Sequence, residues 1–262
     1  EALAQGADTI ITCGAVQSNH ARITAQVCKR IGLDCILIQN GEKPNVASGN
    51  HKVNLMLNVP IHYVSAREER DIKMLEVFDE LKRKEKNPYI IPLGASNATG
   101  CLGFVNAVWE LKQQQEEMGI EFDYIVHSTS SGGTQAGLEI GKRLFGLNKL
   151  KIIGVSADNS FEQIANSVLS CAEPVLDRLG NPFQIDKSDI TVDANFIGPG
   201  YGLPSKESNF AIKRFAEVEG ILLDNTYTGK AAAAVINYIE NQKFEANQNI
   251  LFWHTGGILS EL

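Results

Sequence analysis

The segment best suited to chemistry runs from His127 to Gly137 and reads HSTSSGGTQAG. It follows an apolar run and precedes an amphipathic segment, so it is expected to join a strand to a helix. Its glycines let backbone NH groups converge, and a helix beginning near Thr134 would direct its positive end at the loop. Such a loop can hold a phosphate without a lysine. A Gly-rich turn without a ligand is the alternative, because neither a Walker loop nor GxGxxG is present.

A second polar loop, CGAVQSNHAR at residues 13–22, follows the first apolar run. Ser18 and Asn19 stand where a helix is expected to begin, and both residue types are preferred N-caps. Helix-start NH groups and short polar side chains also suit a carboxylate or another polar ligand. The residues support both interpretations, and one does not exclude the other.

Two tyrosines lie in loops rich in glycine and other small residues. Tyr201 lies in GPGYGLP, residues 198–204, where close glycines leave its ring little cover. Tyr227 precedes Thr228 in DNTYTGKA, residues 224–231. A surface tyrosine in a turn, a packing role for Tyr227 and simple N-capping by Thr228 are the alternatives to roles in a binding site.

The residues that other reaction chemistries require are missing. The chain has no GxSxG elbow, no HExxH or paired-ligand spacing among its five histidines and no CxxC among its five cysteines. We therefore predict reduced thiols, no disulfide framework and no metal site. HTGG at 254–257 is one more small-residue loop after an apolar run. The loops together suit a phosphate-bearing cofactor that performs the chemistry itself.

The elements that position these loops alternate along the chain. Apolar, β-branched runs predict strands at residues 8–12, 35–39, 61–64, 89–92, 124–127, 151–155, 191–196 and 249–253. Amphipathic patterns predict helices at about 17–31, 48–57, 68–86, 100–118, 132–146, 159–179, 205–219 and 228–241. This alternation indicates an α/β protein with parallel sheets covered on both faces, in three αβα layers.

The segment LGASNATG at 93–100 consists of small and polar residues and is the best candidate for the connection between two domains. It divides the chain into a smaller N-terminal α/β domain, residues 1–95, and a larger C-terminal one, residues 96–262. Ligands of open α/β sheets bind beyond the carboxyl ends of strands, often between domains. Loops at strand ends are therefore the strongest candidates for binding sites.

The composition is that of an ordinary globular protein. The chain has 262 residues, 44% of them hydrophobic and 21% charged. Its net charge of −7 argues against a broad surface for nucleic acid or anionic membranes. No apolar run reaches the roughly 18 residues of a membrane span. We expect a cytoplasmic protein with neither nucleic-acid nor membrane partners.

Six motifs, taken in chain order, resemble one enzyme family. They are QSNHAR, GASN followed by GCLGF, SGGTQAG, GPGYG, YTGKA and HTGG. Each is weak alone, but the ordered set runs through essentially the whole chain. It resembles the D-cysteine desulfhydrase/1-aminocyclopropane-1-carboxylate deaminase family, which uses pyridoxal 5'-phosphate (PLP). The resemblance implies PLP fold type II, similar to the tryptophan synthase β subunit, with the cofactor between two α/β domains.

The resemblance also implies roles for single residues. Three would act on the substrate: Ser18 beside its carboxylate, and Tyr201 and Tyr227 facing it. Eight would bind the cofactor: Asn19 at the ring oxygen, Ser131, Gly132, Gly133 and Thr134 around the phosphate, Thr228 at the pyridine nitrogen, and Thr255 and Gly256 less directly.

One departure from the family concerns the Schiff-base lysine. On the family spacing it lies in a GGNKxRK segment roughly ten residues before Glu1, and PLP chemistry requires it. Neither Lys142 nor Lys230 stands in an equivalent place. Residues 1–5, with Gly6 after them, also resemble the last turn of a helix. We therefore expect upstream sequence to be missing and the chain alone to be inactive.

A second departure is mild: Asn225 and Thr226 replace the Pro-Val pair usual before the tyrosine.

The reaction that the resemblance implies is α,β-elimination on a small amino acid. D-cysteine is the best candidate substrate, with pyruvate, ammonia and hydrogen sulfide as products, and the enzyme is expected to be a homodimer. Ring-opening deaminases of the family carry a glutamate at the position of Thr228, whereas a neutral threonine suits loss of a good leaving group. Deamination of 1-aminocyclopropane-1-carboxylate and L-cysteate sulfo-lyase activity are alternatives. A non-catalytic anion-binding protein of the same fold is an alternative from another class.

Overall fold

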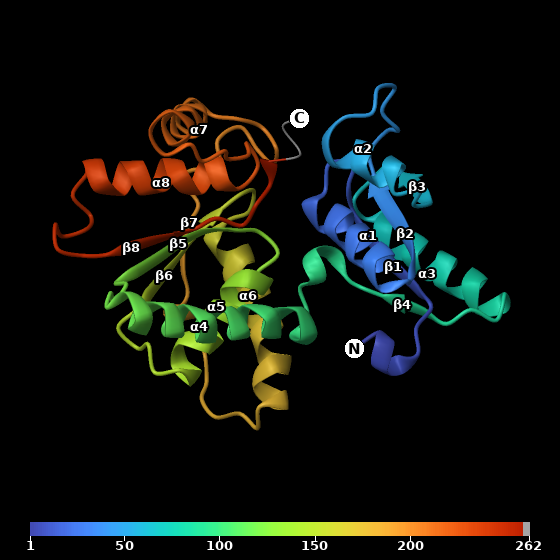
Figure 1. Cartoon of the computed structure of the whole chain (residues 1–262), viewed down its shortest axis with the longest axis horizontal. Helices are drawn as coiled ribbons and strands as arrows, with labels where there is room; N and C mark the ends of the chain where they lie inside the picture. Colours follow the sequence, from blue (N-terminus) through green and yellow to red (C-terminus); the bar gives the residue numbers. More distant parts are fainter. Residues whose placement is uncertain (259–262) are drawn as a thin grey trace. The chain divides into compact units, whose positions relative to one another are not determined.

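The computed structural model describes residues 1–258. They form two compact units, Glu1–Ala95 and Ser96–Ile258, each built on a four-stranded parallel sheet (Figure 1). The α/β class with two parallel sheets is thereby confirmed. The second predicted domain continues to residue 262, and residues 259–262 lie outside the described part.

The first unit has the strand order β3-β2-β1-β4. Its elements are β1 (Thr9–Ala15), α1 (Asn19–Ile31), β2 (Asp34–Asn40), α2 (Gly49–Met56), β3 (Ile61–Val64), α3 (Glu69–Arg83) and β4 (Pro88–Ile90), with short 3-10 helices at Leu3–Gln5 and Leu93–Ala95. Neighbouring residues of β1 point to opposite faces, so Ile10 packs with Ala21 of α1 whereas Ile11 packs with α3. Helices therefore cover both faces of this sheet.

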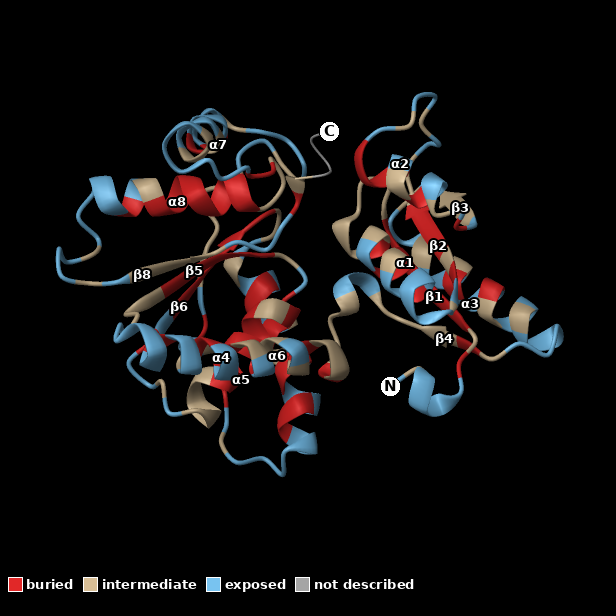
Figure 2. Cartoon of the chain, in the orientation of Figure 1, coloured by how far each residue is buried: buried red, intermediate tan, exposed pale blue. Residues whose placement is uncertain are grey.

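The second unit has the strand order β7-β6-β5-β8. Its elements are α4 (Ala98–Met118), β5 (Tyr124–Thr129), α5 (Gly133–Leu144), β6 (Lys151–Ser156), α6 (Phe161–Arg178), a 3-10 helix (Lys187–Asp189), β7 (Thr191–Asp193), α7 (Lys206–Glu219), α8 (Thr228–Glu240) and β8 (Ile250–Trp253). Ile125 packs with α4 and α5, and the next residue, Val126, packs with α8. Figure 2 shows β5 buried between these layers.

Every predicted strand and helix forms, with ends displaced by a few residues. Strand β1 continues to Ala15 because it pairs with β2 as far as Asn40. Strand β7 stops at Asp193, whose carboxylate accepts the Asn195 NH at 2.9 Å and turns the chain out of the sheet. None of the described helices is long and apolar enough to cross a membrane.

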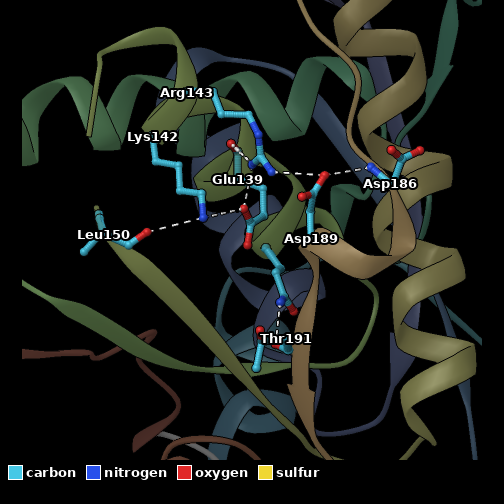
Figure 3. A network of polar contacts seen from close by, with 8 residues as sticks. Glu139, Lys142, Arg143, Leu150, Asp186, Asp189 and Thr191 are labelled. Atoms are coloured by element: carbon cyan, nitrogen blue, oxygen red, sulfur yellow. Dashed lines mark hydrogen bonds and ion pairs between the residues drawn. The ribbon is translucent and has the colours of Figure 1, made fainter. Parts of the chain in front are cut away.

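A buried charge network holds α5, the helix that begins at the glycine loop (Figure 3). The carboxylate of Glu139 is 1% exposed and lies 2.8 Å from Arg143 and 3.0 Å from Lys142. Arg143 also reaches Asp189 at 3.3 Å, beside β7. Gln135 of the same helix donates to the carbonyl of Thr191 in β7 at 2.9 Å. These contacts fix α5 against the sheet, and with it the loop that α5 begins.

Candidate functional site

The predicted site residues of each unit lie beyond the carboxyl ends of its strands or at the starts of its helices. In the second unit, β5 and β8 are paired in parallel, so the loops that follow them leave the same edge of the sheet. The glycine loop follows β5, and HTGG follows β8. The hydroxyl of Ser128, near the end of β5, lies 3.3 Å from that of Thr255 and joins the strand end to the HTGG loop.

The glycine loop presents backbone donors at the start of α5. Gly132 is the N-cap in the left-handed conformation, with a φ of 85°, and no side chain caps the helix. Within the described residues, the NH groups of Gly132, Gly133 and Thr134 have no hydrogen-bond acceptor. Unpaired helix-start NH groups and the positive end of the helix dipole fit a phosphate group. The loop therefore has the donor set that its sequence predicts.

Gly132 is also required by packing. A Cβ at this position would lie 2.7 Å from backbone atoms of Ser167 and Val168 in α6. A Cβ at Gly133 would lie 3.2 Å from the Cα of Ser96. The Ser96 hydroxyl in turn donates to the Ser131 hydroxyl at 2.6 Å. The turn is thus held closely between α6 and the segment that precedes α4.

The two loop tyrosines meet. Their hydroxyl oxygens are 2.5 Å apart, and their rings are nearly perpendicular with centroids 5.8 Å apart. Burial, and then the neighbouring Tyr201 and Asp158, raise the pKa of Tyr227 well above its ordinary value. The Tyr227 hydroxyl therefore stays protonated near neutral pH. One hydroxyl proton joins the pair.

Asp224, which sequence analysis did not single out, organises the start of α8. Its fully buried carboxylate accepts the NH groups of Thr226, Tyr227 and Thr228 at 3.1, 3.1 and 2.7 Å. The Thr228 hydroxyl donates to the same carboxylate at 2.6 Å and accepts the Asp224 NH at 2.9 Å. The N-cap position is Tyr227, so simple N-capping by Thr228 is wrong. An aspartate four residues before the helix was the available signal.

The HTGG loop packs directly on this carboxylate. A Cβ at Gly257 would lie 2.6 Å from Cγ of Asp224, so the close approach requires glycine. His254 Nε2 donates to the Leu222 carbonyl at 3.0 Å, and its Nδ1 accepts the NH of Gly256 at 3.0 Å. The structure thereby brings Thr255 and Gly256 to the loop that carries Tyr227 and Thr228.

In the first unit, Ser18 and Asn19 begin α1 beyond the end of β1. The Ser18 hydroxyl oxygen accepts the NH of Ala21 at 3.1 Å, which confirms the capping interpretation. Its proton is still a donor, so the cap is compatible with binding a carboxylate. Gly14 provides the room, because a side chain there would overlap Ser18.

Asn50 at the start of α2 orients Asn19. Arg22 Nε can only donate, so the Asn50 atom 3.1 Å away is the amide oxygen. Asn50 Nδ2 then donates to Asn19 Oδ1 at 2.8 Å and to the Gln17 carbonyl at 2.9 Å. The Asn19 oxygen is thereby engaged, and its NH2 group is the part left to a ligand. Asn50 is fully buried and lies 31 positions from Asn19, so sequence analysis missed it.

Comparison with known proteins agrees with these features. Residues 1–256 match the family model described as pyridoxal-phosphate dependent enzyme. The D-cysteine desulfhydrase of Klebsiella pneumoniae (strain 342) is 36% identical over 263 residues, which is 98% of this chain and 78% of that protein. The D-cysteine desulfhydrase of Yersinia pestis (strain Pestoides F) is 37% identical over 262 residues, with the same shares of both chains.

Solved structures agree as well. The crystal structure of an ACC deaminase homologue aligns with a TM-score of 0.90 and 32% identity, over 100% of this chain and 77% of that one. A threonine deaminase from T.th. aligns with a TM-score of 0.68 at 14% identity, over 96% of this chain and 78% of that one, which is a likeness of fold alone.

Proposed function

Because the chain belongs to the family of pyridoxal-phosphate-dependent enzymes, we propose that it eliminates sulfide from D-cysteine, yielding pyruvate, ammonia and hydrogen sulfide. Its fold is that of type II enzymes, and its cofactor is PLP. One observation carries the choice of reaction: the 36% and 37% identity to two D-cysteine desulfhydrases over 98% of this chain.

The described residues fit PLP in three places. The unpaired NH groups of Gly132, Gly133 and Thr134 would hold the phosphate, and the Asn19 NH2 group would donate to the ring oxygen. Thr228, whose hydroxyl is held by two contacts with Asp224, would lie at the pyridine nitrogen. When bound, PLP supplies an electron sink for the negative charge that develops at the α-carbon of the substrate.

Three side chains would handle the substrate. The Ser18 hydroxyl, whose oxygen already caps α1, would donate its proton to the substrate carboxylate. Tyr201 and Tyr227 would face the substrate as one hydrogen-bonded pair. The raised pKa of Tyr227 keeps its hydroxyl neutral near neutral pH, so the pair would place a neutral hydroxyl group beside the departing thiol group.

Deamination of 1-aminocyclopropane-1-carboxylate is the second candidate, favoured by the 0.90 TM-score to an ACC deaminase homologue. The neutral Thr228 argues against it, because ring opening demands a deeper electron sink than loss of a thiol does. L-cysteate is a further substrate within reach of the same chemistry.

The test is a panel of substrates given to PLP-loaded protein that carries the family's Schiff-base lysine segment before Glu1. We expect sulfide and pyruvate from D-cysteine at a kcat/KM at least about tenfold above that for any other member. The other members are L-cysteine, L-cysteate and 1-aminocyclopropane-1-carboxylate. Ring opening faster than D-cysteine turnover would contradict the proposal.

We also propose that the two units are the two domains of the enzyme and that it works as a cytoplasmic homodimer. The family resemblance of the ordered motifs implies the dimer, and sedimentation analysis tests the oligomeric state. A monomer at micromolar concentration that retains full turnover would contradict the dimer.

A further inference from the structure

Lys230 is a lysine buried completely within α8. Its relative exposure is 0%, and it is the largest fully buried side chain of the described residues. Burial lowers the pKa of its ammonium, and Asp158 and Asp224 act in the opposite direction. Removing an ammonium from water is costly, whereas a methionine of similar length could fill the same space without that cost. The position therefore requires an explanation by what the ammonium contacts.

The ammonium bridges two loops. Its Nζ donates to the carbonyl of Ala157, just beyond β6, and to the carbonyl of Gly200, both at 2.8 Å. The Gly200 carbonyl also accepts the NH of Leu203 at 3.3 Å. Lys230 thus joins α8 to the end of one strand and to the GPGYG loop.

The GPGYG loop needs such a restraint. Gly198, Gly200 and Gly202 have φ values of 66°, 151° and 72°, a region that other residues rarely adopt. Glycines lose the most backbone freedom on folding, so a loop built from them needs contacts that restrain it. The carbonyl held by Lys230 belongs to the residue directly before Tyr201.

Lys230 also stands three residues after Tyr227, at the start of the same helix. The Lys230 side chain therefore connects the loop that contains Tyr201 to the start of the helix that follows Tyr227. We propose that Lys230 is a positioning residue that holds the Tyr201 hydroxyl 2.5 Å from the Tyr227 hydroxyl. Its relevance to turnover rests on the proposed function, in which this pair faces the substrate.

The first test measures the coupling between the two hydroxyls by a double-mutant cycle in unfolding free energy. The variants are Tyr201→Phe, Tyr227→Phe and the pair, each made in the wild-type and the Lys230→Met backgrounds. We expect coupling in the wild type and its loss in Lys230→Met. Hydrogen exchange of residues 199–203 should become at least about tenfold faster in Lys230→Met.

Tyr238→Phe is the matched control. Tyr238 is also a buried residue of α8, but its hydroxyl donates to Asp193 of β7, at 2.6 Å. It should leave both the coupling and the exchange of residues 199–203 unchanged. A folded Lys230→Met protein with unaltered coupling, or an equal effect of Tyr238→Phe, would overturn the proposal.

A second measurement leaves Lys230 in place, in case Lys230→Met does not fold. In protein labelled with ¹⁵N-lysine, a buried ammonium with two acceptors should give a slowly exchanging NH3 signal. Tyr201→Phe should shift that signal, and Tyr238→Phe should not. An unshifted signal in Tyr201→Phe overturns the proposal. Neither experiment uses substrate, so both outcomes are independent of whether D-cysteine is turned over.

Discussion

The two units hold their candidate site residues with different chemistry. In the first unit a neutral amide does it: Asn50 donates to the Asn19 side chain and the Gln17 carbonyl, and its own oxygen accepts Arg22 Nε. In the second unit, buried charges do it: the Asp224 carboxylate holds the start of α8, and the Lys230 ammonium holds the tyrosine loop. A neutral amide is cheap to bury and loses little when a bond is broken, whereas a buried charge leaves several donors or acceptors unpaired. The second unit should therefore be the more sensitive to substitution.

The largest expected effect is at Asp224. Asp224→Ala removes the acceptor of three backbone NH groups and one hydroxyl, all at the buried start of α8. We expect a loss of about 3 kcal/mol in the free energy of unfolding, measured in urea. Asp186→Ala is the control, since Asp186 also caps a short helix but is exposed, and about 1 kcal/mol is expected there. Equal losses would remove the contrast between buried and exposed carboxylates.

A substitution at Gly132 separates the contribution of backbone strain to stability from that of close packing. Gly132→Ala should destabilise the protein by about 2 kcal/mol more than Gly146→Ala does. Both glycines have positive φ, 85° and 75°, but a Cβ at Gly146 meets nothing within 4 Å. Thermal unfolding of the two variants measures the difference. If they lose the same stability, the close approach to α6 is unimportant.

Each unit also has a histidine that its surroundings keep neutral, the half-buried His20 in the first and the fully buried His127 in the second, so their responses to acid can be compared. Burial lowers the pKa of both His20 and His127 to about 4. The unfolded state binds these protons near pH 6.5, so stability is present above that pH and is lost as the pH falls toward 4. At pH 5 each histidine should account for about 2 kcal/mol of lost stability.

The measurement is urea unfolding at pH 5 and pH 7 for the wild type, His20→Gln and His127→Gln. Each variant should lose less stability between the two pH values than the wild type does. An unchanged pH dependence in both variants would show that these histidines already protonate in the folded state.

The smallest expected effect is at Asn50. Asn50→Ala breaks the bonds to Gln17 and Asn19 and the bond that Arg22 Nε donates, and we expect about 1 kcal/mol of lost stability because Arg22 is only half-buried and can turn to water. Asn45→Ala, an exposed asparagine in the loop before α2, is the control and should change nothing. If Asn50→Ala loses as much stability as Asp224→Ala, the two units do not differ in their sensitivity to substitution.

The sequence predicted the elements well because hydrophobic patterns are local. The pair Ile10 and Ile11 shows this, since two adjacent apolar residues already imply a strand covered on both faces. The glycine loop was predictable for the same reason, because its strand, turn and helix lie in one short segment. The type II fold followed from the ordered motifs, and the solved relatives confirm it.

The residues that position the candidate site were not predictable, because their partners lie far away in the sequence. Lys230 appears in the sequence as one lysine in an alanine-rich helix, yet its partner Ala157 is 73 residues away. Asn50 and Asn19 are 31 positions apart. No periodicity marks such pairs, so only the folded structure identifies them.

The most direct test of the account is whether the start of α5 binds phosphate. Amide NMR spectra of the ¹⁵N-labelled protein would be followed during titration with PLP and with inorganic phosphate. The signals of Gly132, Gly133 and Thr134 should shift in a saturable way with both, while those of Gly146 and Gly180 stay in place. If PLP binds and these three amides do not shift, the phosphate is held elsewhere and the proposed site is wrong.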